Sequence, residues 1–324
     1  VKLEIVLREG LSLGEVNVVR RRFGTTKLRS SAMNVDIISS AELSRAACCN
    51  LGESFVTNPS VDVSYSDAAT GAKQIKLLGL SGTYVQMMTE NIPNYRGAAA
   101  PYGLGYVPGP WMQSIQVSKG SSSVKNGYES ITGQINVEFK KPQLPEADWV
   151  SANLFASSTG RYEANADATL KLSKRWSTSL LAHYENETMA HDANHDGFAD
   201  IPRVEQYNLW NRWAYMGDHY VFQAGIKALS EWRNSGQVNH GGNPGQELYK
   251  IGIDTRRYEA FTKNAYIFNK EKNTNLALIL QGTFHNQDAV YGHKLYDVDQ
   301  TNVYASLLFE TEFSKRHSLS TGLS

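Results

Sequence analysis

The chain has 324 residues, and its 32 basic and 32 acidic side chains give a formal net charge of zero, so charge offers no reason to expect nucleic acid as a partner. Mean hydropathy is mildly negative, and no window approaches the run of about 18 apolar residues that a membrane helix requires. Any membrane crossing would need a closed barrel, because only that strand architecture pairs every backbone group in lipid.

The chain opens on VKLEIVLREG (1–10), where apolar and polar residues alternate as in one strand. Residues 11–33 are polar and basic and resemble a linker. No initiator Met or leader precedes Val1, and the last residues read as an unfinished strand. We therefore expect the chain to be a piece of a longer precursor.

Residues 34–64 mix strand and helix signals. A predicted strand over 34–38 leads to Ser39 and Ser40, either of which can cap a helix that ends near Ser54. A second strand is predicted to begin at Val61.

Two adjacent cysteines, Cys48 and Cys49, lie on the predicted helix. A disulfide between neighbours is strained, so they predict no disulfide framework. Thiolates that bind a soft metal are one interpretation, and two small buried side chains are the other.

The stretch 74–141 is the most informative part of the chain. It is a run of short predicted strands joined by tight glycine turns, and it stops at Lys140-Lys141-Pro142. Neither a Gly-x-Ser-x-Gly elbow nor a His-Glu-x-x-His motif occurs within this stretch. We therefore predict a small folded domain that is not an enzyme.

From Asp148 onward the sequence alternates with a period of two. In 162–172 one face carries Tyr, Ala and Leu, and the other carries Glu, Asn, Asp, Thr and Lys. The alternation returns in five further segments, 176–185, 207–216, 220–228, 274–284 and 301–313. A soluble β-sandwich alternates in the same way, so alternation alone does not select the membrane.

The connections favour a barrel. Short turns at 173–175, 217–218, 269–274 and 314–318 alternate with longer loops at about 187–203, 233–252 and 288–299, as in outer-membrane barrels. Aromatic residues gather near predicted strand ends, as in an interfacial girdle: Tyr162, Trp176, Tyr184, Tyr207, Trp210, Trp213, Tyr215 and Tyr220. About nine strands are visible, and because bacterial barrels usually have an even number, we predict a truncated barrel.

One predicted loop carries a pattern of oxygen ligands. Asp192, Asn194 and Asp196 precede Gly197, and Asp200 follows, which matches the start of a calcium loop. The glutamate that completes an EF-hand is missing. Calcium bound within 192–200 and an Asx-turn loop without metal both remain open, and no cofactor is otherwise required.

These segments together resemble the TonB-dependent outer-membrane receptors. Four stretches carry the resemblance: LGEVNVV at 13–19, the helix and NPSV turn within 42–63, the hairpin within 75–93, and the segment 103–141 with SIQVSKG and GYESITGQIN. The family's usual Asp-Gly turn in the hairpin is Glu90-Asn91 here, and Asn tolerates left-handed geometry.

The resemblance implies a chain of three parts. Residues 1–12 would be the end of a preceding carboxypeptidase-regulatory-like domain, and residues 13–142 an α+β plug. Residues 143–324 would be the first part of a transmembrane antiparallel β-barrel, contributing about nine strands to a total of about 22.

The resemblance also implies residue roles. The segment 13–19 would contact TonB, and the plug's apical loops would face an extracellular ligand. The residues concerned are Leu13, Glu15, Val16, Val18 and Val19 for TonB, and Asn94, Tyr95, Arg96 and Tyr102 for the ligand. For the second set, ordinary loop punctuation by Gly and Pro is the other interpretation.

By the same resemblance, the protein would lie in the cell outer membrane and import a siderophore, another metal chelate or a cobalamin-like ligand. TonB and its inner-membrane complex would supply the energy, and outer-membrane lipid and a surface lipoprotein would be further partners. Two other classes stay open: a non-transporting surface-binding or adhesion protein, and a soluble secreted β-sandwich.

Overall fold

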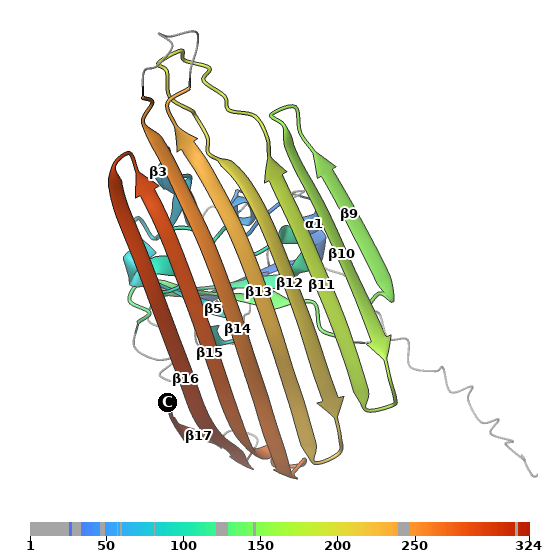
Figure 1. Cartoon of the computed structure of the whole chain (residues 1–324). Coiled ribbons are helices and arrows are strands. Elements are labelled where there is room, and N and C mark those ends of the chain that lie inside the picture. The colour runs from blue at the N-terminus through green and yellow to red at the C-terminus, as the bar shows by residue number, and fades with distance from the viewer. Residues whose placement is uncertain are drawn as a thin grey trace, which may run out of the picture.

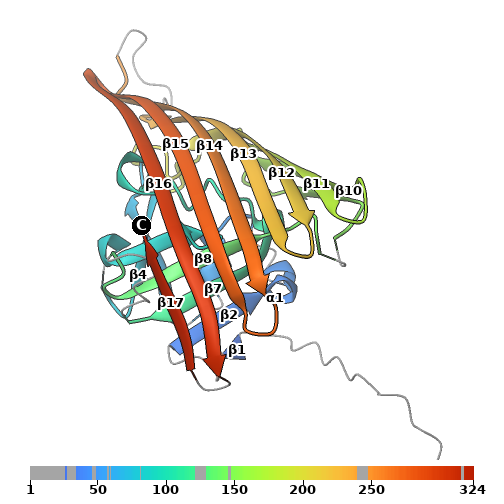
Figure 2. The same ribbon diagram turned by 90° about the horizontal axis from the view of Figure 1, so that it is seen from below.

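The computed structural model describes residues 26–27, 34–45, 49–56, 58, 60–80, 82–120, 129–144, 147–238, 247–314 and 317–324. They form a body of short strands, which we call the plug (described residues up to 144), and a sheet of long strands, which we call the wall (147 onward). The wall lies along one side of the plug in both views (Figure 1; Figure 2).

The plug is built on a six-stranded sheet in the order β1-β2-β7-β8-β5-β6. Its strands are β1 (Thr26–Lys27), β2 (Asn34–Ser39), β5 (Val85–Thr89), β6 (Ile92–Pro93), β7 (Met112–Lys119) and β8 (Gly133–Phe139). Every residue of β8 is buried. β5 pairs with it in parallel and β7 antiparallel, so the segment that leads toward the wall is also central in the plug sheet. A separate hairpin pairs β3 (Val61–Asp67) with β4 (Ala72–Leu77).

The predicted helix to Ser54 is wrong in length. Helix α1 covers Ser40–Arg45, and a distinct 3-10 turn follows at Glu53–Phe55. Local polar bonds close this second turn, because Asn50 Nδ2 donates to Glu53 Oε1 at 3.1 Å and the Cys49 amide donates to Glu53 Oε2 at 3.1 Å. In the part of the chain that the structure describes, no helix is long and apolar enough to span a membrane.

The wall is a nine-stranded antiparallel sheet whose strands follow one another in chain order from β9 to β17. The bounds are β9 (Val150–Ala156), β10 (Arg161–Lys171), β11 (Trp176–Glu187), β12 (Arg203–Met216), β13 (Tyr220–Gly236), β14 (Lys250–Asn269), β15 (Thr274–Tyr291), β16 (Lys294–Ser314) and β17 (His317–Leu323). The sheet is open, with β9 and β17 at its edges, which agrees with the predicted truncated barrel.

The predicted loop at 288–299 is wrong. β15 and β16 continue through this region, with Val290 opposite Leu295, and a two-residue turn at Gly292-His293 joins them. The polar residues that suggested a loop lie on strands of 18 and 21 residues. Because about 9–11 residues suffice to cross a bilayer, such strands extend well into water, where polar side chains are expected on both faces.

The two faces of the wall invert the usual soluble pattern. On β10, Glu163, Asn165 and Asp167 point toward the plug and are buried, whereas Tyr162 and Leu170 on the opposite face are exposed. One predicted girdle residue is misplaced, because Trp210 points inward and is only 5% exposed. Its ring packs 4.4 Å from that of plug residue Phe139.

Candidate functional site

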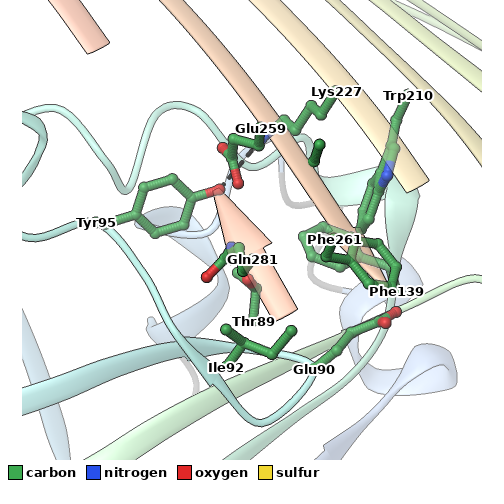
Figure 3. A pocket seen from close by; sticks show the side chains of 11 residues that line it. Thr89, Glu90, Ile92, Tyr95, Phe139, Trp210, Lys227, Glu259, Phe261 and Gln281 are labelled. Carbon is green, nitrogen blue, oxygen red and sulfur yellow. Dashed lines mark hydrogen bonds and ion pairs between the residues drawn. The ribbon is translucent and has the colours of Figure 1, made fainter. Parts of the chain in front are cut away.

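The plug meets the wall through polar side chains that water does not reach. The register aligns Trp210 on β12, Lys227 on β13 and Glu259 on β14 in one inward row. Each of these three side chains faces the plug segment after β5, so the wall contributes both charges and an aromatic ring to the contact (Figure 3).

Glu90 is the first hub of this contact. It begins the two-residue β5–β6 turn, in which Glu90 has φ 52° and Asn91 φ 62°, and these paired left-handed residues suit a tight hairpin. The Glu90 carboxylate pairs with Arg212 of β12 and lies 3.5 Å from Lys263 Nζ of β14. Lys263 also donates to the Glu90 carbonyl at 2.7 Å. Two wall strands therefore hold one plug turn.

The pKa of Glu90 reflects its contacts with Arg212 and Lys263. Burial by itself raises the pKa of the carboxyl, but the positive charges of Arg212 and Lys263 outweigh it, so the pKa lies below its ordinary value. Glu90 is only 3% exposed, and the ion pairs are thus shielded from solvent screening.

Asn94 and Tyr95 form the second hub. Asn94 Oδ1 accepts from Arg257 Nη2 at 2.6 Å, and Asn94 Nδ2 donates to Glu259 Oε2 at 2.8 Å. Lys227 Nζ donates to the Tyr95 hydroxyl at 3.2 Å. Burial, with Glu259 nearby, raises the pKa of Tyr95 well above its ordinary value, so the phenol stays protonated. One amide thus bridges both members of the Arg257–Glu259 ion pair, which are 2.9 Å apart.

A small cavity of about 20 Å³ separates the two hubs. Figure 3 shows the carboxylates of Glu90 and Glu259 on its border, with Lys227 above and the rings of Trp210 and Phe261 at one side. The space suits one water molecule, which needs about 10–15 Å³ of such volume. The contact is therefore polar at both hubs and aromatic between them.

Further ion pairs hold the plug nearer the end of the wall that carries the long loops. Arg161 of β10 pairs with plug residue Glu53 at 2.9 Å and with Glu163 and Glu185 of the wall at 2.7 and 3.1 Å. Arg233, which pairs with Glu231 on its own strand at 2.6 Å, donates to the carbonyl of plug residue Thr70 at 3.3 Å. The plug is thus held by charges over much of its height.

Three of the four predicted ligand residues line one cavity. Asn94, Tyr95 and Arg96 border a space of about 530 Å³ in the plug, but the first two are buried rather than displayed on an exposed loop. Arg96 is half-exposed and pairs with Glu129 at 2.7 Å. Tyr102 is buried at a separate cavity of about 110 Å³, under the Arg233 guanidinium. The role of all four as ligand contacts stays a prediction.

The predicted calcium loop is ordered by its own backbone. The Asp192 carboxylate accepts from the amides of Asp196 and Gly197 at 3.1 and 2.9 Å, and Asp200 accepts from Ala193 at 2.7 Å. Within the described residues, no group of three or more His, Cys, Asp or Glu side chains is arranged to hold a metal ion. Calcium at this loop stays a prediction that requires these carboxylates to turn.

Two other predicted sites can be placed only in part. The TonB segment 13–19 and Cys48 lie outside the described residues. Burial, with Glu163 nearby, raises the pKa of the Cys49 thiol, and a protonated thiol favours a packing role over soft-metal binding.

The charged wall residues at both hubs were missed in the sequence. The sequence does carry a signal for them. Arg212, Lys227 and Glu259 fall on the alternate positions that form the plug-facing side of β12, β13 and β14. Their partners in the plug are more than 100 positions away, and no local pattern could pair them.

Residues 27–134 match the family model of the TonB-dependent receptor plug domain. No curated protein matches the chain in sequence. Among solved structures, the chain is similar to the alcaligin outer-membrane receptor FauA from Bordetella pertussis, with a TM-score of 0.69 and 12% identity over 89% of this chain and 45% of that one.

Two further structures show the same fold. The ferripyoverdine receptor of Pseudomonas aeruginosa has a TM-score of 0.64 and 14% identity, over 89% of this chain and 40% of that one. The ferric-catecholate import receptor Fiu from E. coli K12 has a TM-score of 0.61 and 15% identity, over 87% and 45%. The chain thus spans less than half the length of these proteins.

Proposed function

We propose that this outer-membrane protein takes part in energy-coupled import of a scarce nutrient. Two findings support the proposal: residues 27–134 match the plug model of the TonB-dependent receptors, and the wall shares the fold of solved receptors. Receptors of this family are transporters and not enzymes. The plug is the gate, and TonB supplies the force that opens it.

The ligand class that we propose is a ferric chelate. The three similar structures are an alcaligin receptor, a ferripyoverdine receptor and a ferric-catecholate import receptor. The 530 Å³ cavity beside Arg96 falls in the usual size range for ligand pockets. A metal chelate of another kind and a cobalamin-like ligand are the outcomes against which this proposal is tested.

The observation that carries the proposal is the double role of Asn94 and Tyr95. Both line the cavity, and both also bond to the charged wall residues Lys227, Arg257 and Glu259. A ligand that moves this loop would break hydrogen bonds between plug and wall directly. The attraction within a buried ion pair is largely cancelled by the cost of removing both charges from water. Such a contact therefore fixes how the plug docks against the wall without holding the two strongly together.

The proposed coupling runs through the segment 13–19. Ligand binding would shift the plug ensemble and present the segment 13–19 to the periplasm, where TonB would add a strand to it. Proton-motive force at the inner membrane would then move the plug.

Deletion of residues 13–19 tests this coupling in the full receptor expressed in a strain that lacks its own copy. We expect uptake of a radio-iron chelate to stop while binding of the chelate to whole cells persists, because the deletion removes the TonB contact and leaves the cavity intact. Unchanged uptake would contradict TonB coupling. Growth of a receptor-deletion strain on defined iron, copper and cobalamin sources identifies the nutrient independently.

A further inference from the structure

The outward face of the wall has a hollow across β9–β13. It is a cavity of about 620 Å³ on the side away from the plug, and five neighbouring strands and Tyr258 of β14 contribute to it. Its floor is made of alanines, among them Ala164, Ala166, Ala182 and Ala228, and Leu154 stands at one side.

The strand register explains why the hollow forms here. One outward row runs from Ala166 to Ala182, Leu209, Ala228 and Tyr258 on successive strands. Small side chains thus sit between large ones, and the larger neighbours become walls. Further along the same row, Tyr258 is opposite Phe284, so the surface of β14 and β15 is filled at this level.

Two aromatic belts set the depth of the hollow in the bilayer. Toward the long loops, the centroid of the Tyr207 ring lies 4.9 Å from that of Tyr184 and 6.1 Å from that of Trp232. Toward the short turns, the ring of Tyr215 lies 5.1 Å from that of Trp176. Such belts mark the two membrane interfaces, and the row that contains Ala166, Ala182 and Ala228 lies between them. The hollow therefore opens into the hydrocarbon region.

The upper rim is acidic overall. The Tyr207 hydroxyl donates to Glu205 at 2.9 Å, and Asn186 donates to the Tyr184 hydroxyl at 2.9 Å. Neither Lys nor Arg occurs among the described residues that line the hollow.

The cation beside this rim is Arg256, which is exposed on the same face and lies opposite Ser230. It pairs with Asp254 at 3.5 Å, so Glu205 and Asp254 together outweigh its charge. We therefore expect selectivity to come from the apolar chain below, and a comparison of headgroups tests the contribution of Arg256.

We propose that this hollow binds one acyl chain of an outer-membrane lipid and selects it by the chain and not by the headgroup. The proposal depends on the outer-membrane location and is independent of the transported ligand. A transmembrane helix fits less well, because close helix packing requires a continuous strip of small residues, and Leu209 and Tyr258 interrupt this row.

The test uses the full receptor in nanodiscs of phosphatidylethanolamine and phosphatidylglycerol that contain a phospholipid with a photoactivatable acyl chain. Mass spectrometry maps the crosslinks. The variant Ala182→Phe/Ala228→Phe fills the hollow, and Ala305→Phe, at an exposed outward position on β16, is the matched control. We expect crosslinks concentrated on β10–β13 in the wild type and the control, and their loss in the filled variant.

Three results would overturn the proposal. They are equal crosslinking in the filled variant, wild-type crosslinks spread evenly along the wall, and yields that follow the headgroup when phosphatidylethanolamine and phosphatidylglycerol probes with the same chain are compared. Unchanged heat-modifiable migration on gels confirms that each variant is folded. A crosslink to another protein at this face, in membranes isolated from cells, also counts against a lipid occupant.

Discussion

Glu90 combines two features that are costly on their own. A non-glycine residue in the left-handed region stores about 1–3 kcal/mol of strain, and a buried carboxylate loses its hydration. Both costs are offset by Arg212 and Lys263, whose charges converge on the same side chain. The contact with the wall therefore stabilises this turn conformation.

Replacing Glu90 with Gln removes the charge and keeps the size of the side chain. Arg212 and Lys263 then face each other without their shared anion, and loss of one partner from a buried pair costs about 3–5 kcal/mol. We expect a lower melting temperature of the full receptor in calorimetry. Glu129→Gln is the control, because its pair with Arg96 is partly exposed and such pairs contribute about 0–1 kcal/mol. Equal shifts in both variants would show that the Glu90 pairs with Arg212 and Lys263 stabilise the receptor no more than the exposed pair does.

The same residue predicts an acid-sensitive step. The pKa of Glu90 in the folded protein lies below its ordinary value of 4.5, so folding favours the ionised form. Its stabilising effect is complete above about pH 4.5 and is lost as the pH falls through the lower folded-state pKa. Between pH 6 and pH 3, the melting temperature of the wild type should fall further than that of the Glu90→Gln variant. Parallel curves would show that Glu90 does not contribute to the loss.

At the residue scale, the sequence shows on which face of a strand each side chain lies, because odd and even positions alternate between the two faces. Trp210 falls on the same parity as Asn208 and Arg212, and this places it on the plug side even though its type suits a membrane interface. The Glu90–Arg212 and Glu90–Lys263 pairs could not be predicted in this way, because the distance between their members in the sequence exceeds any local pattern.

At the scale of the strand, Gly225 on β13 makes room for the aromatic seam. A Cβ at this position would lie 2.6 Å from Phe261 and 2.8 Å from Trp210. Gly225→Ala should therefore destabilise the receptor by about 1–3 kcal/mol through overpacking, measured by calorimetry. Gly282→Ala is the matched control on β15, where a Cβ meets nothing within 4 Å. We expect no loss from the control, and an unchanged Gly225→Ala would show that the seam is loosely packed.

The loop between β11 and β12 predicts a calcium response. Asp192, Asp196 and Asp200 now bond to backbone amides and side chains of their own loop, and calcium would have to gather them. We expect added calcium to slow proteolysis within this loop and a chelator to reverse the effect. Asp196→Asn should weaken the response, whereas Asp218→Asn in an exposed short turn should not. An identical cleavage rate with and without calcium leaves the Asx-turn interpretation.

Element type was predictable, and element length was not. Alternation located β10, β11 and β16, because one face of each strand packs on the plug and the other meets lipid. The upper ends of β15 and β16 looked like a loop, since a strand beyond the bilayer has water outside and no longer needs apolar residues. The helix predicted to end near Ser54 was too long, because α1 covers Ser40–Arg45 and the Asn50–Glu53 bond belongs to a separate 3-10 turn.

At the scale of the whole molecule, the plug is joined to the wall in two ways. The chain connects them, since β8 ends at Phe139 and β9 begins at Val150, and near this junction Lys140 pairs with Asp167 at 2.7 Å. Elsewhere the joint is non-covalent, as where Gln300 of β16 accepts from the Ala98 amide at 2.8 Å. Composition and pattern predicted the two bodies and their order, but this set of contacts depends on how the wall wraps the plug.

The contrast between the covalent link near β8 and the non-covalent contact at Gln300 predicts which additional crosslink between plug and wall stops transport. The Ala98–Gln300 contact is made by the end of the long Gln300 side chain, which is unsuited to a direct disulfide. Cysteines at these two positions, joined by a bismaleimide whose linker contains a reducible disulfide, should fix the ligand-side loop to β16 and abolish uptake of the radio-iron chelate, with recovery after reduction. Chelate binding to whole cells should persist. A pair at Lys140 and Asp167 is the control, because the chain already holds that part of the plug to the wall, and uptake should continue. Import through the receptor tethered at Ala98 and Gln300, with the crosslink verified by mass spectrometry, would mean that this loop stays in place while the ligand passes.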